Sequence, residues 1–173
     1  MRFFLVVLGL VVALAIQTTF VATIAGNGAP VDLVLVVVIA VAISGGPVVG
    51  LWSGSVGGLF QDALSGGILG VGGVSKTLVG YFAGQLATHF MVARLWDQLL
   101  MFFFGSIIHS GLFVGVYGLL SDTGTLSSYR SVVVQAVVNA AIGVGLAGGL
   151  RMAPGAIERR RLRRRWRHGG FGQ

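Results

Sequence analysis

Long apolar runs separated by short polar breaks are the main pattern of this chain. Three runs, roughly 3–24, 98–120 and 131–150, reach the length of about 20 residues that a helix needs to cross the hydrocarbon core of a bilayer. A fourth run, 68–91, is of similar length but contains Lys76. The pattern therefore predicts three membrane-spanning helices directly, and a fourth if the membrane tolerates the lysine.

The stretch 33–60 contains 28 residues without a charge and is interrupted by Gly-Gly-Pro at 45–47. As one helix it would be about 42 Å long, against a hydrocarbon core of about 30 Å. Glycine permits backbone conformations that other residues avoid, and proline has no amide hydrogen for a continuing helix. We therefore predict a tight hairpin at 44–47 that separates two spans, 31–44 and 47–63. The alternative is one kinked helix, which gives five spans instead of six.

Composition supports the membrane assignment. The chain is 55% hydrophobic and 10% charged, with a mean hydropathy of +0.91, whereas soluble domains carry about 25% charged residues. The predicted fold class is an all-α integral membrane protein, a compact bundle of six transmembrane helices in residues 1–153. A basic tail, 154–173, follows it.

Charge gives the predicted orientation. The formal net charge is +7, and eight of the twelve basic residues are arginines between Arg151 and Arg167. Short segments rich in Lys and Arg stay in the cytoplasm, so we expect both termini on the cytoplasmic side of the membrane. The first apolar run resembles a signal peptide, but no clean cleavage site follows it, and we interpret it as an uncleaved span.

The sequence offers little for catalysis or cofactor binding. It has no cysteine, and its three histidines lie in separate segments without the spacing of zinc sites. It has four widely spaced aspartates and one glutamate, and no phosphate loop or nucleotide fingerprint. We expect a non-enzymatic protein without cofactor or metal.

Two charged residues, Asp62 and Lys76, fall among many glycines in predicted spans. An ionisable side chain at the bilayer centre costs at least about 2.5–3.5 kcal/mol, so something must offset it. The two are 14 positions apart on either side of a predicted turn at 65–67. We expect an ion pair that locks this hairpin; the alternatives are a polar ligand cavity and a contact with a partner subunit.

Glycines recur at the spacing that allows close helix packing in membranes, most clearly at Gly50, Gly54 and Gly58. Packing inside the bundle explains most glycines of the chain, but this stripe exceeds what a short hairpin needs. The hypothesis is that the single transmembrane helix of a partner packs on it.

Other polar residues have simpler interpretations. Asp32 precedes an apolar run, as a helix N-cap does. His109 lies within a span, where bonding to a neighbouring helix is favoured over a role as proton carrier, and Gln135 and Asn139 are placed to bond across the bundle. Seven arginines of the tail are predicted to contact anionic lipid: Arg159, Arg160, Arg161, Arg163, Arg164, Arg165 and Arg167. Nucleic acid is not an expected partner, because no module that reads it accompanies this charge.

The segment from Pro30 to Gly84, about a third of the chain, resembles the rod shape-determining MreD family of bacteria. The resemblance rests on a Pro-x-Asp-Leu opening, a Gly-Pro turn, the glycine stripe, an aspartate in glycine-rich surroundings and a Gly-Tyr pair. The residues are Pro30, Asp32, Leu33, Gly46, Pro47, Gly50, Gly54, Gly58, Asp62, Ser65, Gly66, Gly70, Gly80 and Tyr81. Family members more often read Pro-Asp directly, so Val31 is a departure.

The resemblance implies a multi-pass component of the machinery that elongates rod-shaped cells. Its implied partners are MreC, a bitopic membrane protein, the actin-like MreB, and the transglycosylase and transpeptidase that build peptidoglycan. It also implies a fold similar to the six-helix substrate-binding subunits of energy-coupling-factor transporters.

Three functions are compatible with this sequence. The first is a scaffold or regulator of cell-wall elongation that binds an MreC-like partner. The alternative is a vitamin-binding or metal-binding transporter subunit, with Asp62, Lys76 and Asn139 around an outward-facing cavity. A protein that handles phospholipid or lipid II ranks third.

Overall fold

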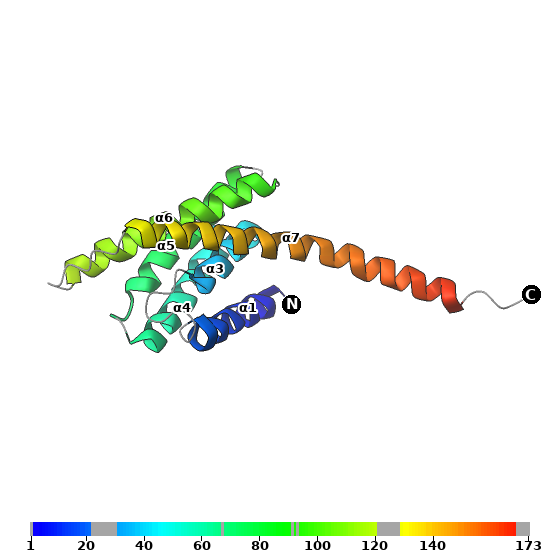
Figure 1. Cartoon of the computed structure of the whole chain (residues 1–173), viewed down its shortest axis with the longest axis horizontal. Coiled ribbons are helices and arrows are strands. Elements are labelled where there is room, and N and C mark those ends of the chain that lie inside the picture. The colour runs from blue at the N-terminus through cyan, green and yellow to red at the C-terminus, as the bar shows by residue number, and fades with distance from the viewer. Residues whose placement is uncertain are drawn as a thin grey trace, which may run out of the picture.

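The computed structural model describes residues 2–21, 31–66, 68–90, 92, 94–120 and 129–168. Within these ranges the chain forms only helices (Figure 1), which confirms the all-α prediction. They are α1 (Arg2–Ile16) with its π-helical continuation η1 (Gln17–Val21), α3 (Leu33–Gly45), α4 (Pro47–Ser65), α5 (Val71–His89), α6 (Leu95–Leu120) and α7 (Tyr129–His168).

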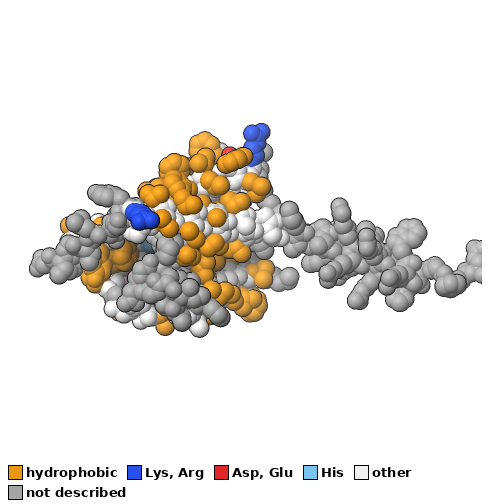
Figure 2. Space-filling model, in the orientation of Figure 1, with side chains coloured by type: hydrophobic (Ala, Val, Ile, Leu, Met, Phe, Trp, Pro, Cys, Tyr) orange, Lys and Arg blue, Asp and Glu red, His pale blue; other side chains and the backbone are white. Residues whose placement is uncertain are grey.

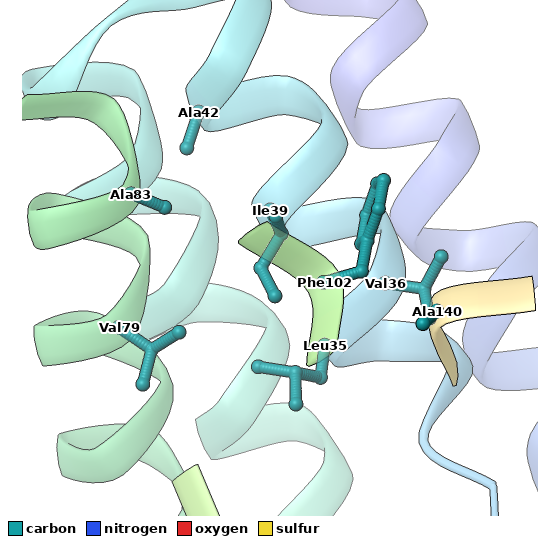
Figure 3. Packing of buried hydrophobic residues seen from close by; sticks show 8 residues of the cluster. All are labelled: Leu35, Val36, Ile39, Ala42, Val79, Ala83, Phe102 and Ala140. Atoms are coloured by element: carbon teal, nitrogen blue, oxygen red, sulfur yellow. The ribbon is translucent and has the colours of Figure 1, made fainter. Parts of the chain in front are cut away.

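Helix α3 is the centre of the bundle. It contacts α1, α4, α5, α6 and α7. None of its residues from Leu33 to Ile43 is exposed, as expected of a helix without a polar face. Leu35 and Ile39 pack there against Val79 of α5 and Phe102 of α6 (Figure 3). A smaller cluster joins the other side of α3 to α1.

The chain reverses direction at the predicted Gly-Gly-Pro break. Helix α3 ends at Gly45, and α4 begins at Pro47. Gly46 between them has φ 87° and ψ −178°, a conformation that is open essentially to glycine alone. The two helices then run antiparallel, because Ala42 faces Gly50 and Val34 faces Gly57. The hairpin is therefore present, and a single kinked helix over 33–60 is excluded.

The glycine stripe of α4 packs inside the chain. Gly50, Gly54 and Gly58 are buried, and a Cβ atom at each would overlap the backbone of α5 at Gly80, Lys76 and Gly73 respectively. Ser55 Oγ and Thr77 Oγ1, 2.8 Å apart, join the same two helices by a hydrogen bond. The hypothesis that a partner helix packs on this stripe is wrong, because α5 already occupies it.

The outer surface of the bundle is apolar. Hydrophobic side chains cover much of the face seen in Figure 2, and large ones are exposed along α1, α4, α5, α6 and α7. In the described part of the chain, α6 and the segment Arg130–Gly149 of α7 are each long and apolar enough to cross a membrane. The segments Phe4–Thr19 and Leu33–Gly45 are apolar but shorter.

Helix α7 is longer than the predicted last span. It continues to His168 and extends beyond the other helices in Figure 1. No helix break separates the predicted bundle, 1–153, from the predicted tail. The side chains of the seven tail arginines lie outside the described ones.

Candidate functional site: a buried polar network that joins four helices

Asp32 lies at the start of α3 and is buried there. Its Oδ1 accepts a hydrogen bond from Leu35 N at 2.9 Å, which confirms the predicted N-cap. Gln17 of η1 adds a second cap, because its Oε1 accepts from Leu33 N at 2.8 Å and from Val34 N at 3.3 Å. The first amide hydrogens of α3, which have no partner within the helix, are thus satisfied by side chains.

The second carboxylate oxygen of Asp32 binds Lys76. The distance from Lys76 Nζ to Asp32 Oδ2 is 2.7 Å, and both side chains are at most 5% exposed. Lys76 lies on α5, one and a half turns after its start at Val71, on the face that packs against α3. The lysine that interrupts an apolar run is therefore paired across two helices that are not consecutive in the chain.

His109 of α6 completes the charged cluster. Its Nε2 lies 3.4 Å from Asp32 Oδ2 and 3.4 Å from Lys76 Nζ, and the side chain is buried. A single ring nitrogen either donates to the carboxylate or accepts from the ammonium, so one tautomer satisfies only one of these contacts. The prediction that His109 bonds to a neighbouring helix is confirmed.

Helix α7 joins the cluster through Asn139. Its Oδ1 accepts from Asp32 N at 3.0 Å, and its Nδ2 donates to Ser106 Oγ at 3.1 Å. One turn away, Ser110 Oγ donates to Gln135 Oε1 at 3.1 Å. The predicted bonds of Gln135 and Asn139 across the bundle are confirmed. One polar network now connects α3, α5, α6 and α7.

Asp62 does not pair with Lys76. Its Oδ2 accepts instead from Gly70 N at 2.9 Å and Gly73 N at 3.1 Å, so the carboxylate caps the start of α5. These amide hydrogens have no partner inside α5, and a nearby carboxylate also complements the positive end of the helix. The predicted Asp62–Lys76 pair is therefore corrected: each residue is satisfied, but by a different partner.

The buried polar groups of this network link helices to one another. The carboxylate and the ammonium bind each other, and the Asn139 amide binds Asp32 N and Ser106 Oγ. The described His, Asp and Glu side chains form no group of three that would hold a metal ion. Buried polar atoms without a partner are Gln61 Oε1, Gln98 Oε1 and His109 Nδ1, within the described part of the chain. The polar contacts of this site connect helices and hold them in place.

Comparison with known proteins decides the family. A family model described as rod shape-determining protein MreD matches residues 1–144. The chain belongs to the MreD family. Membership makes it a rod shape-determining membrane protein, in keeping with its apolar exterior. No curated protein and no solved structure matches the chain.

The residues of the polar network lie within the part of the chain that the family model matches. The match includes Asp32, Lys76, His109 and Asn139, and it ends within α7 at residue 144, before the arginine-rich segment. The four-helix network of this MreD-family chain therefore lies inside the matched region, and its arginine-rich segment lies outside it.

Sequence reasoning missed the role of Asp32 as the partner of Lys76, and the roles of Gln17 and Ser106. One signal was available for the ion pair. In the predicted up-and-down order, the helices that begin near residues 31 and 68 start on the same side of the membrane, which places Asp32 near Lys76. The shorter sequence distance favoured Asp62, whose carboxylate is taken by backbone amides.

Proposed function

We propose that this chain is a non-enzymatic scaffold of the cell-wall elongation complex that maintains rod shape by binding a bitopic MreC-like partner. Through that partner it works with an MreB-like filament and with the transglycosylase and transpeptidase of lateral wall synthesis. It does so as a multi-pass protein of the bacterial inner membrane. The family membership supports the shape-determining part of this proposal.

The scaffold role rests on one observation, which is that these buried polar groups have their binding partners within the chain. Asp32 binds Lys76 of α5 and Asn139 of α7, and Asn139 also binds Ser106 of α6, so four helices are joined. Asp62 binds backbone amides. A ligand site needs polar groups that converge on open space. Here the polar groups converge on each other, which favours a rigid body that presents its outer faces to partners.

The helix directions support the proposed six membrane crossings. Helices α4 and α5 run antiparallel, because Gly50 meets Gly80 and Gly54 meets Lys76. Helices α6 and α7 also run antiparallel, because Ser106 meets Asn139 and Ser110 meets Gln135. Because α3 and α4 form an antiparallel hairpin at Gly46, they account for two crossings, whereas one kinked helix would account for one. With the arginines of the last helix inside, both termini are cytoplasmic.

The arginine-rich end of α7 has a proposed role of its own. Arg159, Arg160, Arg161, Arg163, Arg164, Arg165 and Arg167 contact anionic lipid on the cytoplasmic side. The proposal rests on sequence: each basic residue near an anionic leaflet contributes about 1 kcal/mol of attraction.

Affinity purification of the tagged full chain from its native membrane in mild detergent tests the function, with mass spectrometry of both proteins and small molecules. We expect a single-pass protein with a large extracytoplasmic domain at near-equal amount, followed by cell-wall synthases. A chain in which all seven tail arginines are lysine keeps the positive charge that sets the proposed orientation; it is the matched variant and should retain this partner. A copurifying vitamin with a pair of ATPases would overturn the proposal.

A further inference from the structure

Helices α5 and α6 enclose an open apolar groove on the outside of the bundle. Its volume is about 500 Å³, and it is lined from α5 by Val79, Ala83 and Leu86 and from α6 by Met101, Phe104 and Ile108. The groove lies apart from the polar network, because Lys76 and His109 are not among its lining residues.

The groove has two different ends. One is at the connection between the helices, where Phe90, Val92 and Asp97 line it. Arg94 lies beside this end with an exposed side chain, and its backbone N donates to Asp97 Oδ2 at 3.2 Å. The other end is apolar, at Val79 and Ile108, inside the span of both helices. We call the charged end the mouth.

The length of the groove matches one leaflet. Its lining spans 12 positions along each side, from 79 to 90 on α5 and the residue that follows it, and from 97 to 108 on α6. The 11 steps between the first and last positions measure about 16 Å at 1.5 Å per residue. Half of a hydrocarbon core of about 30 Å is about 15 Å. A partner's transmembrane helix would cross the whole hydrocarbon core. One acyl chain of a lipid ends at the middle of the core, and the length of this groove corresponds to that distance.

The mouth carries both signs of charge. Trp96, 73% exposed, adjoins it, and aromatic residues of this kind lie at the level of lipid headgroups. Arg94 offers a guanidinium to a phosphate, and Asp97 offers a carboxylate to a cation. A zwitterionic headgroup with a primary ammonium has a phosphate for the guanidinium and a cation for the carboxylate. A primary ammonium also donates hydrogen bonds, which a quaternary ammonium does not.

We propose that this groove is a specific site for a phospholipid of the phosphatidylethanolamine type. One acyl chain lies between α5 and α6, the phosphate binds Arg94, and the ammonium binds Asp97. In the proposed orientation the lipid belongs to the cytoplasmic leaflet. The site is independent of the MreC-like partner, so it is tested on the chain alone, and its failure leaves the proposed function untouched.

The test is a lipid titration of the purified full chain in detergent, followed by native mass spectrometry. Phosphatidylethanolamine, phosphatidylcholine and phosphatidylglycerol with identical acyl chains are compared. We expect phosphatidylethanolamine to bind about three- to fivefold tighter than either of the others, the size of effect that a partly exposed ion pair gives. Equal binding of the three lipids, or tightest binding of phosphatidylglycerol, would overturn the proposal.

Variants locate the site. Leu100→Trp fills the groove and should abolish the bound lipid, whereas Val137→Trp on the exposed face of α7 should not. Leu86→Trp is the second filling variant if the first lowers the yield of folded protein. Asp97→Asn keeps an acceptor for Arg94 N; it should remove the preference over both other lipids and leave a lipid bound in the groove. Lipid retained by both tryptophan variants would contradict the site.

Discussion

Asp32 and Lys76 are individually costly to bury, and each makes the burial of the other tolerable. Removing one partner of a buried pair costs about 3–5 kcal/mol, because the remaining charge is left without a counterion in a medium of low dielectric. Removing both charges avoids that cost. Stability at this site therefore depends on the two residues jointly.

Lys76→Met should lower the free energy of unfolding strongly, and adding Asp32→Asn should restore much of it. Asparagine keeps an oxygen for Leu35 N, so the N-cap survives. Reversible denaturation in mixed micelles measures the four states of the double-mutant cycle. The matched control is the cycle of Lys76→Met with Asp62→Asn, which should be additive within about 0.5 kcal/mol. A coupling to Asp62 larger than that to Asp32 would contradict the assignment.

Asp62→Ala should destabilise the chain by about 0.5–2 kcal/mol, because Gly70 N and Gly73 N lose their acceptor at the start of α5. Asp62→Asn retains an oxygen and should cost less. The order of the two melting temperatures checks the capping role. If both variants have the same melting temperature, far below that of the unchanged chain, the negative charge of Asp62 matters more than its hydrogen bonds. That result would contradict the capping role.

At the scale of the elements, the order and approximate limits of the helices were predictable. Apolar runs and Gly-Gly-Pro are local signals, and the structure has helices at each predicted segment with the hairpin at Gly46. Two features were not predictable from local signals. The packing partner of the α4 glycines depends on which helix comes closest to α4 in the fold. The hydrogen-bond partner of Asp62 depends on where the first turn of α5 lies.

Gly54→Leu should prevent close packing of α4 on α5 and lower the yield of folded, monodisperse protein before any partner is involved, because its side chain would overlap the α5 backbone. Gly115→Leu is the matched control: it is also a helical glycine, but a Cβ there meets nothing within 4 Å. Size-exclusion chromatography and thermal unfolding separate the two. A folded Gly54→Leu chain that loses only its partner would reinstate partner packing on the α4 stripe.

At the scale of the whole molecule, the six-span orientation is testable because the chain has no native cysteine. Ser44 and Ser65 are exposed at opposite ends of the α3–α4 hairpin, and Thr88 is exposed near the end of α5. Each single change to cysteine is conservative. Impermeant thiol labelling in cells should modify Ser65→Cys and spare Ser44→Cys and Thr88→Cys until the membrane is opened. Labelling of Ser44→Cys from outside would contradict the six crossings.

The central claim is that this MreD-family chain determines shape through its fold and not through chemistry of its buried charges. The most direct measurement replaces the native chain by the Asp32→Asn, Lys76→Met double variant and records cell shape, after confirming that the variant is folded and present in the membrane. The account predicts rods, because the helix contacts remain while the charges are gone. Round cells containing a folded, membrane-inserted double variant would show that the charges themselves act, and would contradict it.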